Sequence, residues 1–336
     1  MKRSESVLLG LFIYLGMVMV CEAASLATGH GKSGKHDLMH DGIRRTYSIY
    51  IPRGIKKSYD IPLLLALHGG GGSAEKWAKY TNYGFERLAD KERFILVYAN
   101  GLEGHWNDGR EVDRFYSHHN KIDDAGFLAR LIDELKHSFP IDASRIYVAG
   151  ASNGGMMAHR FAAEYSDRVT AIASVISSIP TKLQGSLHPA SPVSVLMMNG
   201  TEDPLVPWEG GEVRFGRKRN GTVISTDQSI EFWVDNNHCT SLPTAIELPD
   251  LAPDDGTRVE RTSYDNCNSE SEVVLYKING GGHTWPAYQD RRGVIGKRLI
   301  EGLVGRKSRD IDACKVIWEF FKGQRKRLES GHRAGN

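Results

Sequence analysis

The stretch from residue 146 to residue 160, IYVAGASNGGMMAHR, decides the fold of this chain. Its first four residues form an uninterrupted apolar run, which predicts a strand buried on both faces of a sheet. A G-x-S-x-G sequence centred on Ser152 follows, and helix-forming residues come next. Glycines two places before and after a serine permit a sharp turn, so the pattern predicts a serine exposed between a strand and a helix. A structural turn without chemistry is the alternative.

The rest of the chain alternates strand-like apolar runs with helical patterns. The expected strands cover 44–52, 61–67, 94–99, 169–176, 193–199, 257–263 and 273–278. The expected helices cover 77–89, 125–137, 226–236 and 311–321. This alternation predicts an α/β fold with a mostly parallel central sheet, helices on both faces, and a single domain over 44–322.

Composition sets few limits on function. The chain has 336 residues, of which 40% are hydrophobic and 25% charged, as in soluble globular proteins. A formal charge of +2 indicates no particular partner. The dense basic cluster at 325–327 predicts a solvated basic tail over 323–336, and no nucleic-acid partner is expected.

The first residues resemble a targeting segment. Lys2 and Arg3 precede an apolar core, and a small-residue site allows cleavage after Ala23, so residues 1–23 are predicted to be a signal peptide. A lipoprotein site at Cys21 and an uncleaved anchor are the alternatives. The Gly-, His- and Lys-rich residues 24–43 are predicted to be flexible, without metal-ligand spacing. We therefore expect a secreted or periplasmic protein with no membrane span after cleavage.

Three cysteines would remain after cleavage of the signal peptide, and export permits disulfides. Cys239 and Cys267 lie in polar, loop-rich sequence and are the expected pair. Cys314 lies on an apolar helical pattern and is expected to be a buried free thiol.

Ligand sites in such sheets form at the carboxyl ends of the strands. His68 and four glycines follow the strand at 61–67, and backbone N–H groups in such a run can hold the negative oxygen that develops in acyl transfer. A phosphate-binding loop is the rival interpretation, but no Lys-Ser/Thr pair follows the glycines. A plain turn is the third interpretation.

Two later strand ends carry an acid and a histidine. Asp203 follows the strand at 193–199 and can orient a histidine, with Glu202 as the competing acid. His283 lies in a glycine-rich turn after the strand at 273–278. The order Ser152, Asp203, His283 is the nucleophile–acid–histidine order of α/β-hydrolases.

Together these motifs resemble the polyhydroxybutyrate depolymerase and feruloyl esterase family of secreted α/β-hydrolases. The segments are HGGGG at 68–72, GASNGGMM at 150–157, GTEDP at 200–204 and GGHTWP at 281–286. The resemblance implies a carboxylic ester hydrolase in which Ser152 is the nucleophile, His283 the base and then the acid, and Asp203 the orienting acid. It also implies an oxyanion hole made by Asn153 N–H and by Gly70 or Gly71, and it fits the cysteine pair before the histidine turn.

The implied substrates are polyhydroxybutyrate, 3-hydroxybutyrate oligomers or related polyesters, with feruloyl or acetyl-xylan esters of plant cell walls as the alternative. No polymer-binding module follows the predicted domain in this sequence, so we expect soluble oligomers, amorphous polyester or cell-wall esters rather than crystalline polyester. A serine peptidase and a non-catalytic binding protein on the same fold are the rival functions.

The candidate substrate-binding residues are His68, Trp106 on a polar loop at 105–120, and Trp285 beside the histidine. For both tryptophans, core packing is the alternative. No cofactor or metal is expected, although His118, His119 and Asp123 form a conceivable metal set. Helix capping accounts for the aspartates at 123 and 124.

Overall fold

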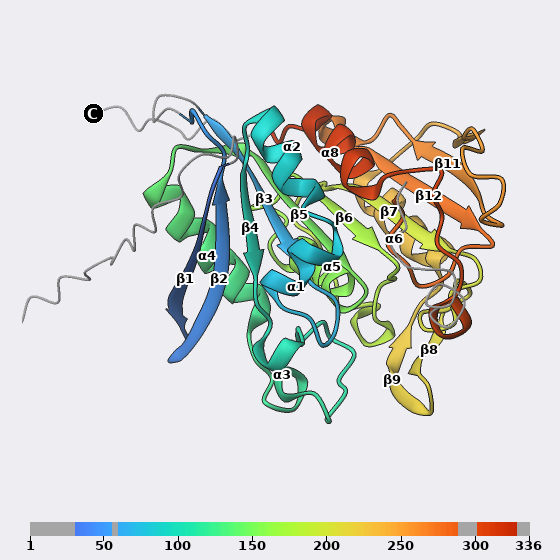
Figure 1. The fold of residues 1–336 in the computed structure, drawn as a ribbon, viewed down its shortest axis with the longest axis horizontal. Helices are drawn as coiled ribbons and strands as arrows, with labels where there is room; N and C mark the ends of the chain where they lie inside the picture. The colour runs from blue at the N-terminus through green and yellow to red at the C-terminus, as the bar shows by residue number, and fades with distance from the viewer. Residues whose placement is uncertain (1–30, 56–59, 288–300, 328–336) are drawn as a thin grey trace, which may run out of the picture.

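The centre of the molecule is a sheet of parallel strands. The computed structural model describes residues 31–55, 60–287 and 301–327 (Figure 1). Within these residues, ten strands form one sheet. Its six neighbouring parallel strands are β4 (Ile95–Ala99), β3 (Ile61–Leu67), β5 (Ile141–Ala151), β6 (Ala171–Val175), β7 (Ser194–Gly200) and β12 (Val273–Asn279). The predicted mostly parallel sheet is confirmed.

Antiparallel strands extend the sheet at both edges. On one side, β2 (Ile43–Ile51) pairs with β4, and β1 (Lys32–His40) pairs with β2. On the other side, β11 (Arg258–Tyr264) pairs with β12, and β10 (Thr244–Glu247) pairs with β11. The backbone N–H and C=O groups at both edges of the parallel part are therefore paired with antiparallel strands.

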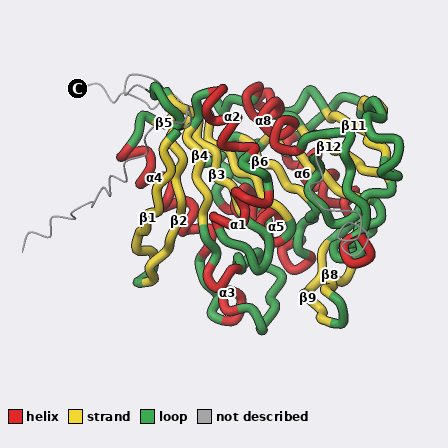
Figure 2. The backbone as a smooth tube through the Cα atoms, viewed as in Figure 1, coloured by secondary structure: helices red, strands yellow, loops and turns green. Residues whose placement is uncertain are grey.

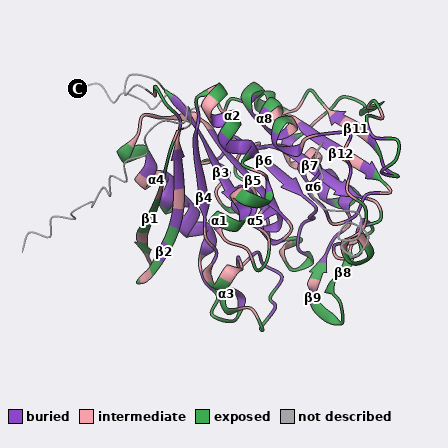
Figure 3. Ribbon diagram, viewed as in Figure 1, coloured by how far each residue is buried: buried purple, intermediate pink, exposed green. Residues whose placement is uncertain are grey.

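Helices cover both faces of the sheet, as predicted. Leu63 and Leu65 of β3 belong to the core on the face with α4 (Asp124–Ser138), α5 (Asn153–Glu164) and α6 (Thr226–Asn237). Leu64 points to the opposite core, with α1 (Ala74–Tyr80), α2 (Gly84–Glu92) and α8 (Ala313–Gly323). Successive side chains of a strand point to opposite faces, so an all-apolar strand is buried twice. Figure 3 shows this continuous buried centre.

Local signals explain where the helices begin. Asp123 accepts from Gly126 N–H and caps α4, as expected, whereas Asp124 forms a buried ion pair with Arg45 of β2. Ser225 and Gln228 form a capping box at the start of α6. The single helix expected over 77–89 is instead α1 and α2.

The predicted flexibility of 24–43 is wrong for the part that the structure describes. Residues Lys32–His40 form β1 and pair with β2 along their whole length. An edge strand with both faces largely exposed shows no hydrophobic alternation, so its polar composition resembles that of a flexible segment. The predicted signal peptide at 1–23 and residues 24–30 lie outside the described residues.

The solvated tail expected from residue 323 is also wrong as far as the structure describes it. Gln324 is buried, its carbonyl accepts from Tyr147 Oη, and Lys326 Nζ donates to Ser166 O. Burial lowers the pKa of Lys326. The segment therefore docks against the sheet end through backbone acceptors that a charge pattern cannot reveal. Residues 328–336 lie outside the described part.

Several short elements have no counterpart in the predictions. A separate hairpin contains β8 (Gly211–Phe215) and β9 (Lys218–Val223), and α3 (Tyr116–His119) lies in the polar loop at 105–120. The described part of the chain also contains the short 3₁₀ turns η1 (Leu102–Gly104), η2 (Thr181–Leu183) and η3 (Asn268–Glu270). In Figure 1, α3 and the β8–β9 hairpin project from the same end of the molecule.

The cysteine predictions are confirmed. Cys239 and Cys267 form a disulfide, and Cys314 of α8 is a buried free thiol. Within the described residues, none of the helices combines the length and apolar character that crossing a membrane requires.

Candidate active site

The turn at Ser152 joins β5 to α5 with a strained backbone. Ser152 has φ 54° and ψ −121°, and its N–H donates to Val175 O at 2.9 Å. At the glycines two places before and after Ser152, neighbouring backbone atoms leave no room for a side chain. A Cβ on Gly150 would lie 2.2 Å from Gly154 O, and a Cβ on Gly154 would lie 2.5 Å from His68 O. The two glycines therefore allow the sharp turn that presents the serine.

Asp203 and His283 meet although 80 residues separate them. Asp203 follows β7 and His283 follows β12, two strands that lie side by side. His283 Nδ1 lies 2.7 Å from Asp203 Oδ2. Asp203 Oδ1 accepts from the N–H groups of Leu205 and Val206 at 2.8 and 2.9 Å. The carboxylate is thereby fixed, and a carboxylate that accepts from Nδ1–H leaves Nε2 unprotonated in the neutral ring.

Glu202 has a different environment from Asp203. Its side chain is 61% exposed, whereas that of Asp203 is 2% exposed. The Glu202 carboxylate lies 3.3 Å from Arg306 Nη1. Of the two acids that compete in the sequence, Asp203 is the one bonded to His283.

A cleft of about 1450 Å³ brings the predicted residues together. Ser152 and His283 both line it, as do Gly70 and Asn153. Figure 2 shows loops and turns around the ends of the central strands. The four motifs, distant in sequence, thus converge at the carboxyl end of the parallel strands, as expected for an open α/β sheet.

Gly70 and Gly71 are the two candidates for the second N–H group of the oxyanion hole, and the structure distinguishes between them. Gly71 has φ +73°, and its N–H donates to Gly104 O at 2.8 Å, so it is already used. Gly72 N–H donates to Gly69 O. In the described parts of the chain, the N–H groups of Gly70 and Asn153 have no acceptor. The geometry therefore favours Gly70 over Gly71.

His68 lines the cleft, and both of its ring nitrogens are bonded to backbone of the neighbouring loops. Its Nε2 accepts from Gly101 N–H at 3.0 Å, and its Nδ1 donates to Gly69 O at 2.8 Å. Burial lowers the pKa of His68 to about 4, so the ring is neutral. Because both nitrogens are occupied, His68 has no hydrogen-bonding atom free for a substrate, and the substrate-binding role expected for it stays a prediction that rests on its place in the cleft wall.

The two tryptophans differ in position. Trp106 is fully buried, its Nε1 donates to His68 O, and it does not line the cleft, so the expected substrate wall is wrong for this residue. Trp285 lines the cleft but is only 3% exposed, with its ring edge-on to Trp77 and Phe85. Trp285 therefore serves mainly to pack the core next to the cleft.

A buried polar network behind the serine turn was not predicted. The side chain of Asn153 accepts from Trp106 N–H at 2.8 Å and donates to Asp108 Oδ2 at 2.6 Å. Asp108 also pairs with Arg110, and the Nε2 of His118 lies 3.6 Å from its Oδ1. Burial opposes ionisation of Asp108, but Arg110, His118 and Asn153 together hold its pKa below the usual value. Sequence gives little signal of such a network, because polar residues in a loop normally face solvent.

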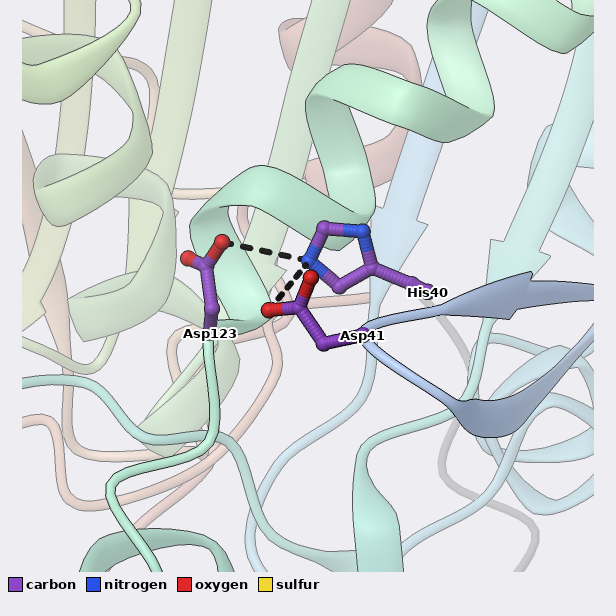
Figure 4. Close-up of side chains that lie close together, drawn as sticks. All are labelled: His40, Asp41 and Asp123. Atoms are coloured by element: carbon purple, nitrogen blue, oxygen red, sulfur yellow. Dashed lines mark hydrogen bonds and ion pairs between the residues drawn. The ribbon is translucent and has the colours of Figure 1, made fainter.

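The conceivable metal set does not assemble. His118 has both ring nitrogens bonded to backbone, at Trp106 O and Val112 N–H. Asp123 instead lies 3.1 Å from Nε2 of His40, with Asp41 at 3.6 Å (Figure 4). The ligand atoms of His40, Asp41 and Asp123 lie within 4.8 Å of one another, and none of these residues lines the cleft. The close-up shows ion pairs between the β1–β2 turn and the start of α4, which account for the cluster.

Comparison with known proteins identifies the family. Residues 62–220 match the family described as the alpha/beta hydrolase fold. The chain is 32% identical to NocK of Nocardia uniformis subsp. tsuyamanensis, which is named as an esterase, over 78% of this chain and 74% of that protein. This chain belongs to the α/β-hydrolases. It is a carboxylic ester hydrolase.

Other relatives of this α/β-hydrolase carry more specific names. Feruloyl esterase B of Piromyces equi is 27% identical over 71% of this chain and 42% of that protein. Poly(3-hydroxyalkanoate) depolymerase C of Paucimonas lemoignei is 27% identical over 81% of this chain and 65% of that protein. The solved acetyl xylan esterase from Aspergillus awamori, at 14% identity and TM-score 0.50 over 75% of this chain and 94% of that chain, supports the fold alone.

Proposed function

We propose that this α/β-hydrolase cleaves carboxylic esters through an acyl-enzyme formed on Ser152. One observation carries the proposal: Ser152 stands on a strained turn in the same cleft as a histidine whose Nδ1 is bonded to a buried carboxylate. Nucleophile, base and orienting acid are the three parts that serine-mediated acyl transfer requires.

The chemistry proceeds in two steps. His283 Nε2 removes the hydroxyl proton as Ser152 Oγ attacks the ester carbonyl, and Asp203 stabilises the resulting imidazolium. The imidazolium then protonates the leaving alcohol, which leaves the acyl-enzyme. Water, deprotonated by the same nitrogen, attacks the acyl carbon, releases the carboxylic acid and restores Ser152.

The oxyanion is held by backbone donors from two elements. The N–H of Asn153 at the start of α5 and the N–H of Gly70 carry no other bond in the described residues, and both residues line the cleft. The positive end of the α5 helix adds to this stabilisation. One such donor lowers the barrier by about 3 to 4 kcal/mol in related chemistry.

For the substrate, we propose esters of the kinds for which the relatives are named. Hydroxycinnamoyl and acetyl esters of plant cell walls come first, since relatives named feruloyl esterase and acetylxylan esterase recur among the matches. Oligomers of 3-hydroxyalkanoates are the second candidate, because a depolymerase matches over 81% of this chain. A cleft of about 1450 Å³ is large enough for either.

We also propose export from the cytoplasm. Residues 1–23 have the charge and apolar pattern of a signal peptide, and the Cys239–Cys267 disulfide is of a kind that persists in oxidising compartments. N-terminal sequencing of the protein from the culture medium or periplasm would test this, with Ala24 as the expected first residue.

The decisive experiment combines labelling with turnover. The purified protein is treated with a fluorophosphonate, and the modified peptide is mapped by mass spectrometry. It is then assayed on 4-nitrophenyl butyrate, methyl ferulate, acetylated xylan and 3-hydroxybutyrate oligomers. We expect the label on Ser152, no label and no turnover in Ser152→Ala, and unchanged behaviour in Ser241→Ala, which replaces an exposed serine outside the cleft.

The panel also separates the rival functions. Cleavage of the butyramide analogue at a rate close to that of the ester would identify a peptidase-like enzyme. Absence of both label and turnover, or full activity in Ser152→Ala, would refute the proposed nucleophile and favour a non-catalytic binding protein.

A further inference from the structure

The cleft that contains Ser152 is lined by an excess of positive charge. Nine lysine or arginine residues line it in the described residues, against one acidic residue, Asp312. The formal charge of the whole chain is only +2, so the excess is local. Clefts lined by one sign of charge concentrate ligands of the opposite sign.

Some of these cations are neutralised by acids outside the cleft. Arg110 pairs with the buried Asp108, and Arg214 pairs with Glu212. Arg114 and Lys218 are different: both are exposed, and neither has a carboxylate within ion-pair distance in the described residues. These two line the cleft and are available to a ligand.

Arg114 and Lys218 come from two segments that are tied to each other. Arg114 lies in the loop at 105–120 with its guanidinium 4.9 Å from the centre of the Phe115 ring, and Lys218 begins strand β9. Arg110 Nη1 of the loop donates to Asn220 O of the hairpin at 3.0 Å. The bond holds the loop against the hairpin, and Figure 1 shows both projecting from one end of the molecule. The two cations therefore belong to one connected wall.

The same wall offers apolar surface. Phe215, next to the hairpin turn, is 64% exposed and lines the cleft, as does the half-buried Phe115. Large exposed aromatics beside unpaired cations match a ligand with both an apolar body and an anionic group. Guanidinium groups in particular suit the planar geometry of carboxylates.

We propose that this wall is a subsite for a carboxylate, and that the enzyme prefers esters carrying a free carboxylate beside the ester that is cleaved. This subsite rests on the proposed hydrolysis at Ser152. It specifies in addition that the preferred substrate of that reaction is negatively charged. Two sources share this chemistry: the acid terminus of a hydroxy-acid oligomer, and uronic acid groups along an esterified polysaccharide.

Matched substrate pairs test the preference. On the acyl side, the mono-4-nitrophenyl ester of adipic acid is compared with 4-nitrophenyl hexanoate. On the alcohol side, 4-carboxyphenyl butyrate is compared with 4-carbamoylphenyl butyrate. The quantity measured is the ratio of kcat/KM for the anionic ester to that for the neutral ester. Intrinsic reactivity cancels when this ratio is compared between protein variants.

The test variant is Arg114→Gln with Lys218→Gln, and the matched control is Arg130→Gln with Lys136→Gln, two exposed cations of α4 outside the cleft. Because an exposed charge pair contributes little, we expect the ratio to fall about two- to tenfold in the test variant for one of the two substrate pairs. The control should keep the wild-type ratio. The charge reversal Lys218→Glu should lower the ratio further.

Ionic strength gives a second readout. The Debye length falls to about 3 Å near 1 M salt, so the wild-type ratio should fall towards that of the test variant. Competition by polygalacturonate against the neutral ester, with dextran as the uncharged control, would assign the subsite to a polysaccharide. Competition by 3-hydroxybutyrate oligomer acids alone would assign it to oligomer termini.

The Ser152→Ala variant separates a failure of the carboxylate subsite from a failure of the proposed catalytic function. If Ser152→Ala abolishes hydrolysis of the neutral esters but the ratio is the same in wild type, test variant and control, the carboxylate subsite is refuted and the catalytic proposal stands. If Ser152→Ala retains hydrolysis of the neutral esters, the catalytic proposal itself fails.

Discussion

The Nδ1 atom of His283 lies 2.7 Å from Oδ2 of Asp203, while Oδ1 of the same carboxylate accepts two backbone N–H groups. The backbone bonds come from Leu205 and Val206, in the turn that follows Asp203 itself. The carboxylate is therefore held by its own turn, and its remaining oxygen fixes both the orientation and the tautomer of the histidine.

Asp203→Asn should lower kcat by about 10³- to 10⁴-fold, because the amide no longer enforces the tautomer that leaves Nε2 free to accept a proton. The neighbouring Glu202→Gln is the matched control. Its carboxylate is exposed and pairs with Arg306, so kcat should change by less than about twofold. Steady-state kinetics on 4-nitrophenyl butyrate measures both. Equal losses in the two variants would contradict the assignment.

Gly154→Ala should destabilise the protein. A Cβ there would lie 2.5 Å from both His68 O and Leu67 O, which are backbone atoms that cannot rotate away. Overpacking of this kind costs about 1 to 3 kcal/mol or more. Gly323→Ala provides the control, since a Cβ there meets nothing within 4 Å and lies on α8, where alanine is favoured by up to about 1 kcal/mol. Urea unfolding measures the difference, and similar midpoints for the two variants would show that the turn can relax.

Asp108→Asn should cost about 3 to 5 kcal/mol, because it leaves the buried Arg110 guanidinium without its partner charge. Replacing both residues, as Asp108→Asn with Arg110→Met, should recover part of that loss. A double-mutant cycle of unfolding free energies measures the coupling. Additive losses would mean that the ion pair does not hold the loop at 105–120.

His68 should make the protein acid-sensitive. Its pKa in the folded protein is about 4, against an ordinary value of 6.5, so the unfolded chain binds a proton more readily than the folded one. Its contribution to stability is therefore complete above pH 6.5 and is lost progressively as the pH falls towards 4. Between pH 7 and pH 5 this single group should lower the unfolding free energy by about 2 kcal/mol.

Unfolding at both pH values measures this effect, with His68→Asn as the comparison. The variant starts less stable, but its loss between pH 7 and pH 5 should be smaller than that of the wild type by the same amount. A histidine NMR titration showing His68 half protonated near pH 6.5 would contradict the prediction directly.

Local patterns in the sequence were enough to predict the central architecture. Strands such as Ile61–Leu67 are apolar at every position, which is the pattern of a strand covered on both faces. The turn at Ser152 was predictable for a similar reason, since its glycines are required by contacts within a few residues and between neighbouring strands. Helix caps such as Asp123 also depend on local backbone alone.

Burial of polar residues was not predictable in the same way. Asp108 and His118 have the composition of a solvated loop, yet they bond to Asn153 and to Trp106 across the site. The edge strand β1 was missed because its pairing with β2 stabilises backbone and leaves no hydrophobic pattern. The basic segment after residue 323 likewise docks through backbone carbonyls.

The sequence by itself determined the central strands and the order of Ser152, Asp203 and His283, because each depends on residue type and on local pattern. The cysteine pair, 28 residues apart, was predicted from its polar, loop-rich surroundings. Only the tertiary structure decided that Asp203 rather than Glu202 bonds His283, that Gly70 rather than Gly71 has its N–H free, and that Trp106 is buried. These choices depend on which hydrogen-bond partners and neighbours the rest of the fold brings to each group, and that information is spread over the whole chain.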